Sequence, residues 1–369
     1  MYDQLREDTL YMMVYAGVMV MAMMSSCYLL FRRGNAIAPD VTPPARLRHW
    51  TAIFFASIVL CHFWYLPTYF LTSSDDVMQG NLIAGLLDCM TIIPLMIVVL
   101  LTMLQDRRRP LWPVAVMVAP LVAGFAWCIA SRSEDLLQVL FVYFLLMCFG
   151  FIIYMIRAIR QYRRWLCDNY ADLEHKEVWQ SFVVLGFFLL VYVVYLLDVG
   201  ELIYEYAMEV ILVVLICYLL WRVETLSDLS LPVNDAEEET GLTGDVEDND
   251  FPLAIRNKIR LLLQQHCIDE QLYLQHDLTL LQLAKAIGTN RSYLSQYFSC
   301  QGTTYNAYIN DLRIKHFVSL YHEAVAAQHP FTAQQLAQKS GFRNYNTFGA
   351  AFKKAMGMNT TEWMRNLAE

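Results

Sequence analysis

Charged residues and catalytic motifs are both scarce in this chain of 369 residues. Only 17% of its residues are charged and 57% are hydrophobic, whereas a soluble domain usually carries about a quarter charged residues. The sequence has no GxxxxGK phosphate loop and no GxGxxG, GxSxG or HExxH pattern. It also lacks the phosphoacceptor and ATP-binding regions that a sensor kinase needs. The missing motifs argue against the commonest nucleotide-binding, hydrolase and zinc-peptidase classes. We therefore expect a protein that is not an enzyme and that needs no cofactor.

Metal-ligand and disulfide spacing is missing as well. The nine cysteines lie mostly inside apolar runs, none stands in CxxC spacing, and none clusters with histidines. Such a pattern predicts neither disulfides nor a metal site.

Charge divides the chain into three zones. Residues 1–223 carry a net charge of −3, residues 224–250 carry −10 without a single lysine or arginine, and residues 251–369 carry +5. The overall charge of −8 thus conceals a basic C-terminal part, as nucleic-acid binding requires. Within the acidic middle zone, residues 232–250 have almost no large apolar residues, which predicts a flexible linker that cannot offset its ordering entropy.

Long apolar runs dominate the first zone. Each is close to the roughly 20 residues that a helix needs to cross the hydrocarbon core of a bilayer. Seven such runs lie at about 9–31, 50–71, 81–104, 111–130, 136–156, 180–198 and 203–222. The sequence therefore predicts a seven-helix transmembrane domain.

The basic residues between these runs predict the orientation. Loops 32–49, 105–110 and 157–179 together hold twelve lysines and arginines, whereas the alternate segments hold only Arg6 and Arg132. By the positive-inside rule the N-terminus lies outside and the C-terminus lies in the cytoplasm. This orientation places the basic C-terminal part in the compartment that holds DNA.

The last ninety residues contain one local pattern twice. In the first copy a short helix precedes Gly288, which suits a turn with positive φ, and Asn290, which can cap a helix that starts at Arg291. The second copy has a short helix, Gly341 and a helix from about Asn344. A short helix, a turn and a polar-faced second helix can lay one helix in the major groove of DNA. The two units are predicted at about 278–299 and 331–354.

This segment resembles the DNA-binding domain of the AraC family of bacterial transcription regulators, over roughly residues 253–365. The residues that carry the resemblance are Leu283-Ala284, Gly288 and Tyr293-Leu294-Ser295, the helix start Tyr308–Ile314, then Leu336-Ala337, Gly341-Phe342, Phe348, Phe352-Lys353-Lys354 and Gly357. The resemblance implies tandem helix-turn-helix units that bind double-stranded promoter DNA, and action together with RNA polymerase.

The polar faces of the two second helices supply the candidate DNA contacts. Arginine favours guanine and glutamine favours adenine in the major groove, while lysines more often contact phosphate. The predicted DNA-binding residues are Arg291, Ser292, Ser295, Gln296, Arg343, Asn344, Asn346, Lys353 and Lys354.

Candidate sensory residues lie in the membrane part. Ionisable groups inside membrane helices are costly and often functional. A histidine and an aspartate in the outer halves of the second and third helices would either pair with each other or face a pocket. Three glutamates spaced by four residues near the last helix would line a vestibule for a small ligand or form an exposed acidic rim. The residues concerned are His62, Asp88, Asp198, Glu201, Glu205 and Glu209.

Taken together, these patterns predict an all-α chain with a seven-helix transmembrane sensor domain (1–223), an acidic linker (224–250) and a cytoplasmic AraC-like domain (251–369). Its expected place is the bacterial inner membrane, where an external or membrane-borne signal would control promoter binding. A homodimer would lengthen the DNA site that is read, although no heptad pattern indicates a coiled coil. Two alternatives stay open at this point: a transporter with a regulatory DNA-binding tail, and a passively anchored transcription factor.

Overall fold

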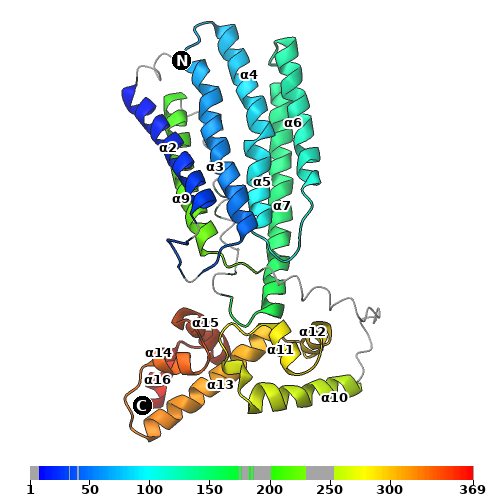
Figure 1. Ribbon diagram of the computed structural model, residues 1–369, viewed down its shortest axis with the longest axis vertical. Coiled ribbons are helices and arrows are strands. Elements are labelled where there is room, and N and C mark those ends of the chain that lie inside the picture. The colour runs from blue at the N-terminus through cyan, green and yellow to red at the C-terminus, as the bar shows by residue number, and fades with distance from the viewer. Residues whose placement is uncertain are drawn as a thin grey trace. The chain divides into compact units, whose positions relative to one another are not determined.

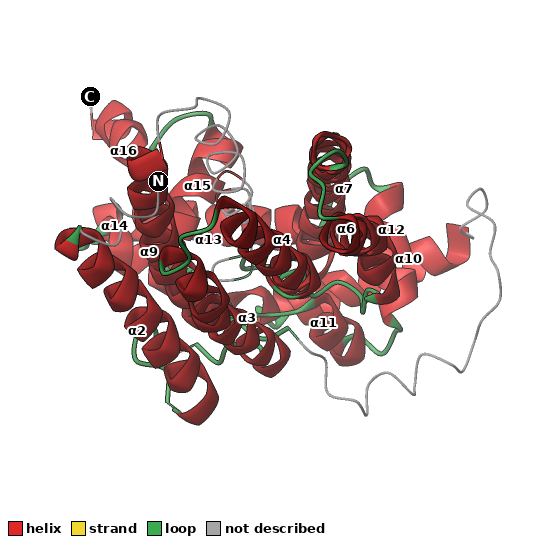
Figure 2. Cartoon of the chain, turned by 90° about the horizontal axis from the view of Figure 1, so that it is seen from above, coloured by secondary structure: helices red, strands yellow, loops and turns green. Residues whose placement is uncertain are grey.

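The computed structural model describes residues 8–229, apart from 33, 40, 174, 175, 177–182, 184, 185 and 187–200, and residues 253–368. In these residues the regular structure is helical and no strand occurs (Figures 1 and 2). An isolated antiparallel bridge joins Tyr170 to Thr279. The predicted all-α class is therefore confirmed for the described part of the chain. Two compact units are distinguished: residues 1–162 with 178–230, and residues 163–177 with 231–369.

The first unit is a bundle of apolar helices. Six helical segments in its described residues are long and apolar enough to cross a membrane. Helix α2 packs on α3 and α9, α3 packs on α5, and α4 packs on α6. Figure 1 shows the long helices of this unit running side by side. The elements are α2 (Thr9–Phe31), α3 (Ala45–Tyr65), the 3-10 turn η1 (Leu66–Tyr69), α4 (Ser74–Met90), α5 (Ile92–Thr102), α6 (Trp112–Ser131), α7 (Leu137–Asn169) and α9 (Glu201–Thr225).

Six of the seven predicted spans overlap these helices, and the run 180–198 lies outside the described residues apart from single positions. The predicted span 81–104 is interrupted. Helix α4 ends at Met90, Thr91 leaves the helical region with φ −122° and ψ −69°, and α5 follows. Pro94 accounts for this break, because it has no N–H to donate to the carbonyl of Met90 and its ring clashes with that carbonyl.

Helix α7 extends well past the predicted span 136–156. It continues to Asn169, so the first half of the predicted loop 157–179 is helical. Ile159, Tyr162 and Leu166 are buried and share one helix face through their i, i+3, i+7 spacing. The arginines that indicated a loop lie on the remaining surface of the same helix.

The chain that leaves α9 is fixed within the first unit. Residues 224 and 225 are still helical, although the linker was predicted to start at 224. The carboxylate of Glu224 is fully buried and lies 3.4 Å from Nε of Arg48. Further on, the Asp228 amide donates to the Thr42 carbonyl at 2.8 Å. The rest of the predicted linker, 230–250, lies outside the described residues.

The second unit consists of short helices around one long helix, α13. Its elements are α10 (Leu253–Leu262), the π-helical turn η4 (Leu263–Asp269), the 3-10 turn η5 (Leu272–Leu274), α11 (Leu280–Ala286), α12 (Arg291–Cys300), α13 (Tyr305–Ala326), α14 (Ala333–Lys339), α15 (Tyr345–Met356) and α16 (Thr360–Ala368). Two hydrophobic cores lie along it. One contains Leu283, Leu294 and Phe298, and the other contains Phe317, Phe348 and Phe352.

Candidate nucleic-acid interface

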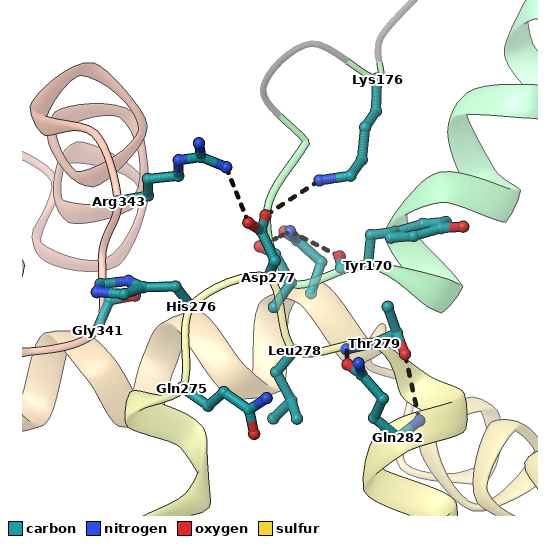
Figure 3. A network of polar contacts seen from close by, with 12 residues as sticks. Tyr170, Lys176, Gln275, His276, Asp277, Leu278, Thr279, Gln282, Gly341 and Arg343 are labelled. Atoms are coloured by element: carbon teal, nitrogen blue, oxygen red, sulfur yellow. Dashed lines mark hydrogen bonds and ion pairs between the residues drawn. The ribbon is translucent and has the colours of Figure 1, made fainter. Parts of the chain in front are cut away.

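The first helix-turn-helix unit is formed by α11 and α12. Thr279 caps α11 with a reciprocal capping box, in which its hydroxyl accepts from the Gln282 amide and the Gln282 side chain accepts from the Thr279 amide (Figure 3). Gly288 turns the chain with φ +69°, and the Asn290 side chain accepts from the Tyr293 amide at 2.7 Å. The predicted turn and cap are therefore both present.

The second helix-turn-helix unit, formed by α14 and α15, repeats this construction. Thr332 forms a capping box with Gln335, Gly341 has φ +92°, and the Asn344 side chain accepts from the Asn346 amide at 2.8 Å. Four residues separate α11 from α12 and five separate α14 from α15. The second turn is therefore one residue longer.

This longer turn changes which residues of the second unit correspond to the first. Asn344 is the cap residue, like Asn290, and Arg343 precedes the helix. Counted from the caps, Tyr345 and Asn346 correspond to Arg291 and Ser292 at the start of the recognition face. Tyr345 and Asn346 are exposed, and Tyr345 was missed because an aromatic residue near a helix start suggests packing. The positions that match Ser295 and Gln296 are Gly349 and Ala350, which have no polar side chain.

The first recognition helix presents a more polar surface. Leu294, Tyr297 and Phe298 are buried against the domain core. Ser292 is exposed, whereas Arg291, Ser295 and Gln296 are half-buried. On α15, Phe348 and Phe352 are buried while Lys353 and Lys354 are exposed in the last turn. The predicted division into core residues and polar face is thus present in both helices, and the DNA-contact roles stay predictions.

Arg313 of α13 connects the two helix-turn-helix units. Its side chain is 2% exposed. Its Nε donates to the Tyr273 carbonyl and its Nη2 to the Gln275 carbonyl, both at 2.8 Å. The guanidinium also lies 5.6 Å from the ring centroid of Phe342. Burial lowers the pKa of Arg313. The charge is held by backbone carbonyls, and sequence reasoning gave it no role beyond the family pattern.

Asp277 brings together residues from three segments of the second compact unit of the chain. Its carboxylate lies 3.4 Å from Lys176 Nζ and accepts from Arg343 Nη1 at 3.0 Å, so the two cations converge on it (Figure 3). Partial burial alone would raise the pKa of Asp277, but the charges and hydrogen bonds of Lys176 and Arg343 outweigh burial and lower it. One predicted DNA-binding residue, Arg343, is therefore engaged within the protein.

Comparison with known proteins supports this architecture. The family model described as a helix-turn-helix domain matches residues 283–366, from the middle of α11 into α16. These residues are an AraC-type helix-turn-helix domain. The match covers less than a quarter of the chain, so it concerns the domain alone. No curated protein and no solved structure matches the chain.

The candidate sensory residues of the first unit have other partners than those expected. Asp88 accepts from Trp64 Nε1 at 3.1 Å and from the Tyr65 hydroxyl at 3.0 Å. His62 lies with its Nε2 3.4 Å from a carboxylate oxygen of Glu209. Between the two predicted alternatives, His62 and Asp88 form no direct hydrogen bond or ion pair with each other, and helix α9 supplies the carboxylate that contacts the histidine.

The glutamates of α9 extend this cluster. Glu209 is buried, so an exposed rim does not describe it. Glu205 accepts from the Tyr11 hydroxyl at 3.2 Å, and Tyr11 lies 2.7 Å from the Tyr69 hydroxyl. Because the Tyr11 proton points to Glu205, Tyr69 donates to Tyr11. Asp198 and the side chain of Glu201 lie outside the described residues. Ligand sensing by any of these groups stays a prediction.

His62 is oriented by its own helix. Its Nδ1 lies 2.8 Å from the Ile58 carbonyl, which can only accept, so Nδ1 carries a hydrogen. A hydrogen bond between Nε2 and Glu209 then requires one proton, carried either by the imidazole ring or by the carboxyl group. This makes the pair an acid–base contact between α3 and α9.

Proposed function

We propose that this protein is a membrane-embedded, one-component transcription regulator of the bacterial inner membrane. The observation that carries the proposal is the presence, in one chain, of an AraC-type helix-turn-helix domain and six helices apolar enough to cross a membrane. In this proposal the tandem units bind promoter DNA sequence-specifically, an external or membrane-borne signal controls them, and regulation works through binding and not through catalysis. RNA polymerase and a second copy of the chain are the expected partners.

The set of segments that make up the second compact unit supports seven membrane crossings. Residues 163–177 and the DNA-binding domain belong to the same compact unit, so both must lie on one side of the membrane. Between them α9 is long and apolar enough to form one crossing, and one crossing alone would leave the two segments on opposite sides. A second crossing between 177 and 201 resolves this, and the apolar run 180–198 is long enough to form it. The positive-inside rule independently assigns this side to the cytoplasm.

The polar cluster of the bundle favours a sensor over a passive anchor. A helix that only anchors a domain gains nothing from buried ionisable groups, which are costly in hydrocarbon. Here His62 and Glu209 are both buried and face each other from different helices. A signal that changes this contact would have to bind one packing of the bundle better than the other.

The decisive experiment is genome-wide DNA occupancy of the full-length protein. Wild type should occupy discrete sites, and an Arg291→Ala, Gln296→Ala double variant should lose them, because both residues lie on the recognition face of α12. Lys315→Ala is the matched control, since it removes one exposed positive charge from α13 and leaves both recognition helices unchanged. Discrete sites retained by the double variant would contradict base reading by α12. Absence of discrete sites in every growth condition would refute the proposed function and favour a transporter.

A further inference from the structure

The segment that follows the membrane part of α7 is built into the second unit. Ala171 is 1% exposed and belongs to the same hydrophobic core as Leu283 and Leu294. Its amide donates to the Leu278 carbonyl at 3.3 Å, next to the bridge between Tyr170 and Thr279. Residues 163–177 therefore make backbone pairs with the strip of chain that leads into α11.

The start of α13 supplies side chains that hold this segment. Asn306 Nδ2 donates to the carbonyls of Tyr170, at 3.2 Å, and Ala171, at 2.7 Å. Asn310 Nδ2 lies 3.5 Å from the Ala171 carbonyl and 3.2 Å from Asn306 Oδ1. Both carbonyls follow the end of α7, where no further helical turn offers amide hydrogens to them. The domain thus satisfies polar groups that the helix end leaves open.

The same segment engages a residue of the recognition helix. Asn169, the last residue of α7, accepts from Arg291 Nε at 2.9 Å. Its own Nδ2 donates to the Trp165 carbonyl at 2.7 Å, which fixes the amide so that its oxygen faces the guanidinium. Arg291 is the first residue of α12 and a predicted base-reading residue. To form a bidentate contact with a guanine, its guanidinium has to turn away from Asn169.

We propose that residues 163–177 are an intramolecular ligand of the AraC-type domain, and that their docking competes with DNA for Arg291. The inference rests on the proposed function and adds to it a means of control. In the docked state Asn169 holds Arg291. Lys176 of the same segment and Arg343 share the carboxylate of Asp277 (Figure 3). Because Leu137–Asn169 is one helix and a candidate membrane span, a change in the position of α7 is transmitted to the residue that holds Arg291.

Two substitutions at Asn169 test the competition and leave the DNA-binding domain unchanged. Asn169→Ala removes the acceptor of Arg291 and should raise occupancy at unsaturated genomic sites by roughly tenfold, which corresponds to the loss of about 1.4 kcal/mol from the docked state. Asn169→Asp places a carboxylate opposite Arg291 and should lower occupancy below that of wild type, because charge-assisted hydrogen bonds are the stronger ones. Gln161→Ala, an exposed position on the same helix, should leave occupancy unchanged.

The proposal is supported if DNA occupancy rises in the alanine variant and falls in the aspartate variant. Equal shifts, or occupancy unchanged in both, overturn it, since a merely structural role of Asn169 would make both variants behave alike. If neither wild type nor either variant occupies discrete sites, the proposed function fails. Hydrogen exchange on the full-length protein then tests separately whether residues 163–177 are docked. The amides of Tyr170 and Ala171, which are both hydrogen-bonded, should exchange slowly in wild type and faster in Asn306→Ala, with Asp311→Asn as the control. Fast exchange in wild type would show that the segment is not docked.

Discussion

Arg313 offers the sharpest test of how α13 holds the two helix-turn-helix units together. Its guanidinium is almost fully buried and donates to the carbonyls of Tyr273 and Gln275. We consider Arg313→Met, because methionine keeps much of the side-chain volume and removes both donors. The substitution leaves the buried carbonyl of Tyr273 and the partly buried carbonyl of Gln275 without these partners, and it also removes the cation beside Phe342.

The expected cost follows from these contacts. A hydrogen bond to a charged donor contributes about 1.5–3 kcal/mol, and a buried acceptor that is left without a partner costs about 1–3 kcal/mol. The cost of burying the guanidinium is recovered in the variant, so we expect about 3 kcal/mol of destabilisation. Such a loss corresponds to more than hundredfold faster exchange of amides that open with the domain.

Hydrogen exchange of the full-length protein measures this effect. The protected amides of α12 and α15 should both exchange faster in Arg313→Met, since α13 packs against both units. Lys315→Met is the control, because Lys315 is 72% exposed and its pair with Asp311 contributes about 0.5 kcal/mol or less. Exchange in Arg313→Met within about threefold of the control would refute a structural role for the buried guanidinium, since threefold corresponds to well under 1.4 kcal/mol.

Two further predictions concern the turn glycines and Asp277. Gly341→Ala should destabilise the second helix-turn-helix unit more than Gly288→Ala destabilises the first. Both positions need positive φ, which costs alanine about 1 kcal/mol. Only at position 341 would the new Cβ also lie 2.9 Å from a backbone atom, the Cα of Leu274. Comparison of the two variants by thermal unfolding checks this, and equal effects would contradict it. The lowered pKa of Asp277 means that its ion pairs stabilise the docked segment above about pH 3.8 and are lost as the pH falls through the lowered value. Asp277→Asn should therefore speed exchange of Tyr170 and Ala171 by the same factor at pH 5 and pH 8, and a factor that differs between them would show that another group titrates.

Local features of the DNA-binding domain were predictable from the sequence. The cap at Asn290, the glycine turns at 288 and 341 and the buried faces of α12 and α15 depend on contacts between residues three or four apart, which a sequence pattern displays directly. The apolar runs likewise indicated six of the helices, because the length needed to cross a bilayer is a property of the chain alone. The break between α4 and α5 could have been read from Pro94 in the same way.

Only the tertiary structure decided which distant groups meet. His62 pairs with Glu209 and not with Asp88, since partner choice depends on which faces of α3, α4 and α9 pack together, and periodicity places a residue on a face without naming the face opposite. The same holds for Asn169 and Arg291, separated by 122 positions in the sequence. In a run rich in arginine, the sequence indicated a solvated loop between 157 and 179. The helix continues there because the domain core accepts Ala171 and its side chains bind the carbonyls that the helix leaves open, and both partners lie more than a hundred residues further along the chain.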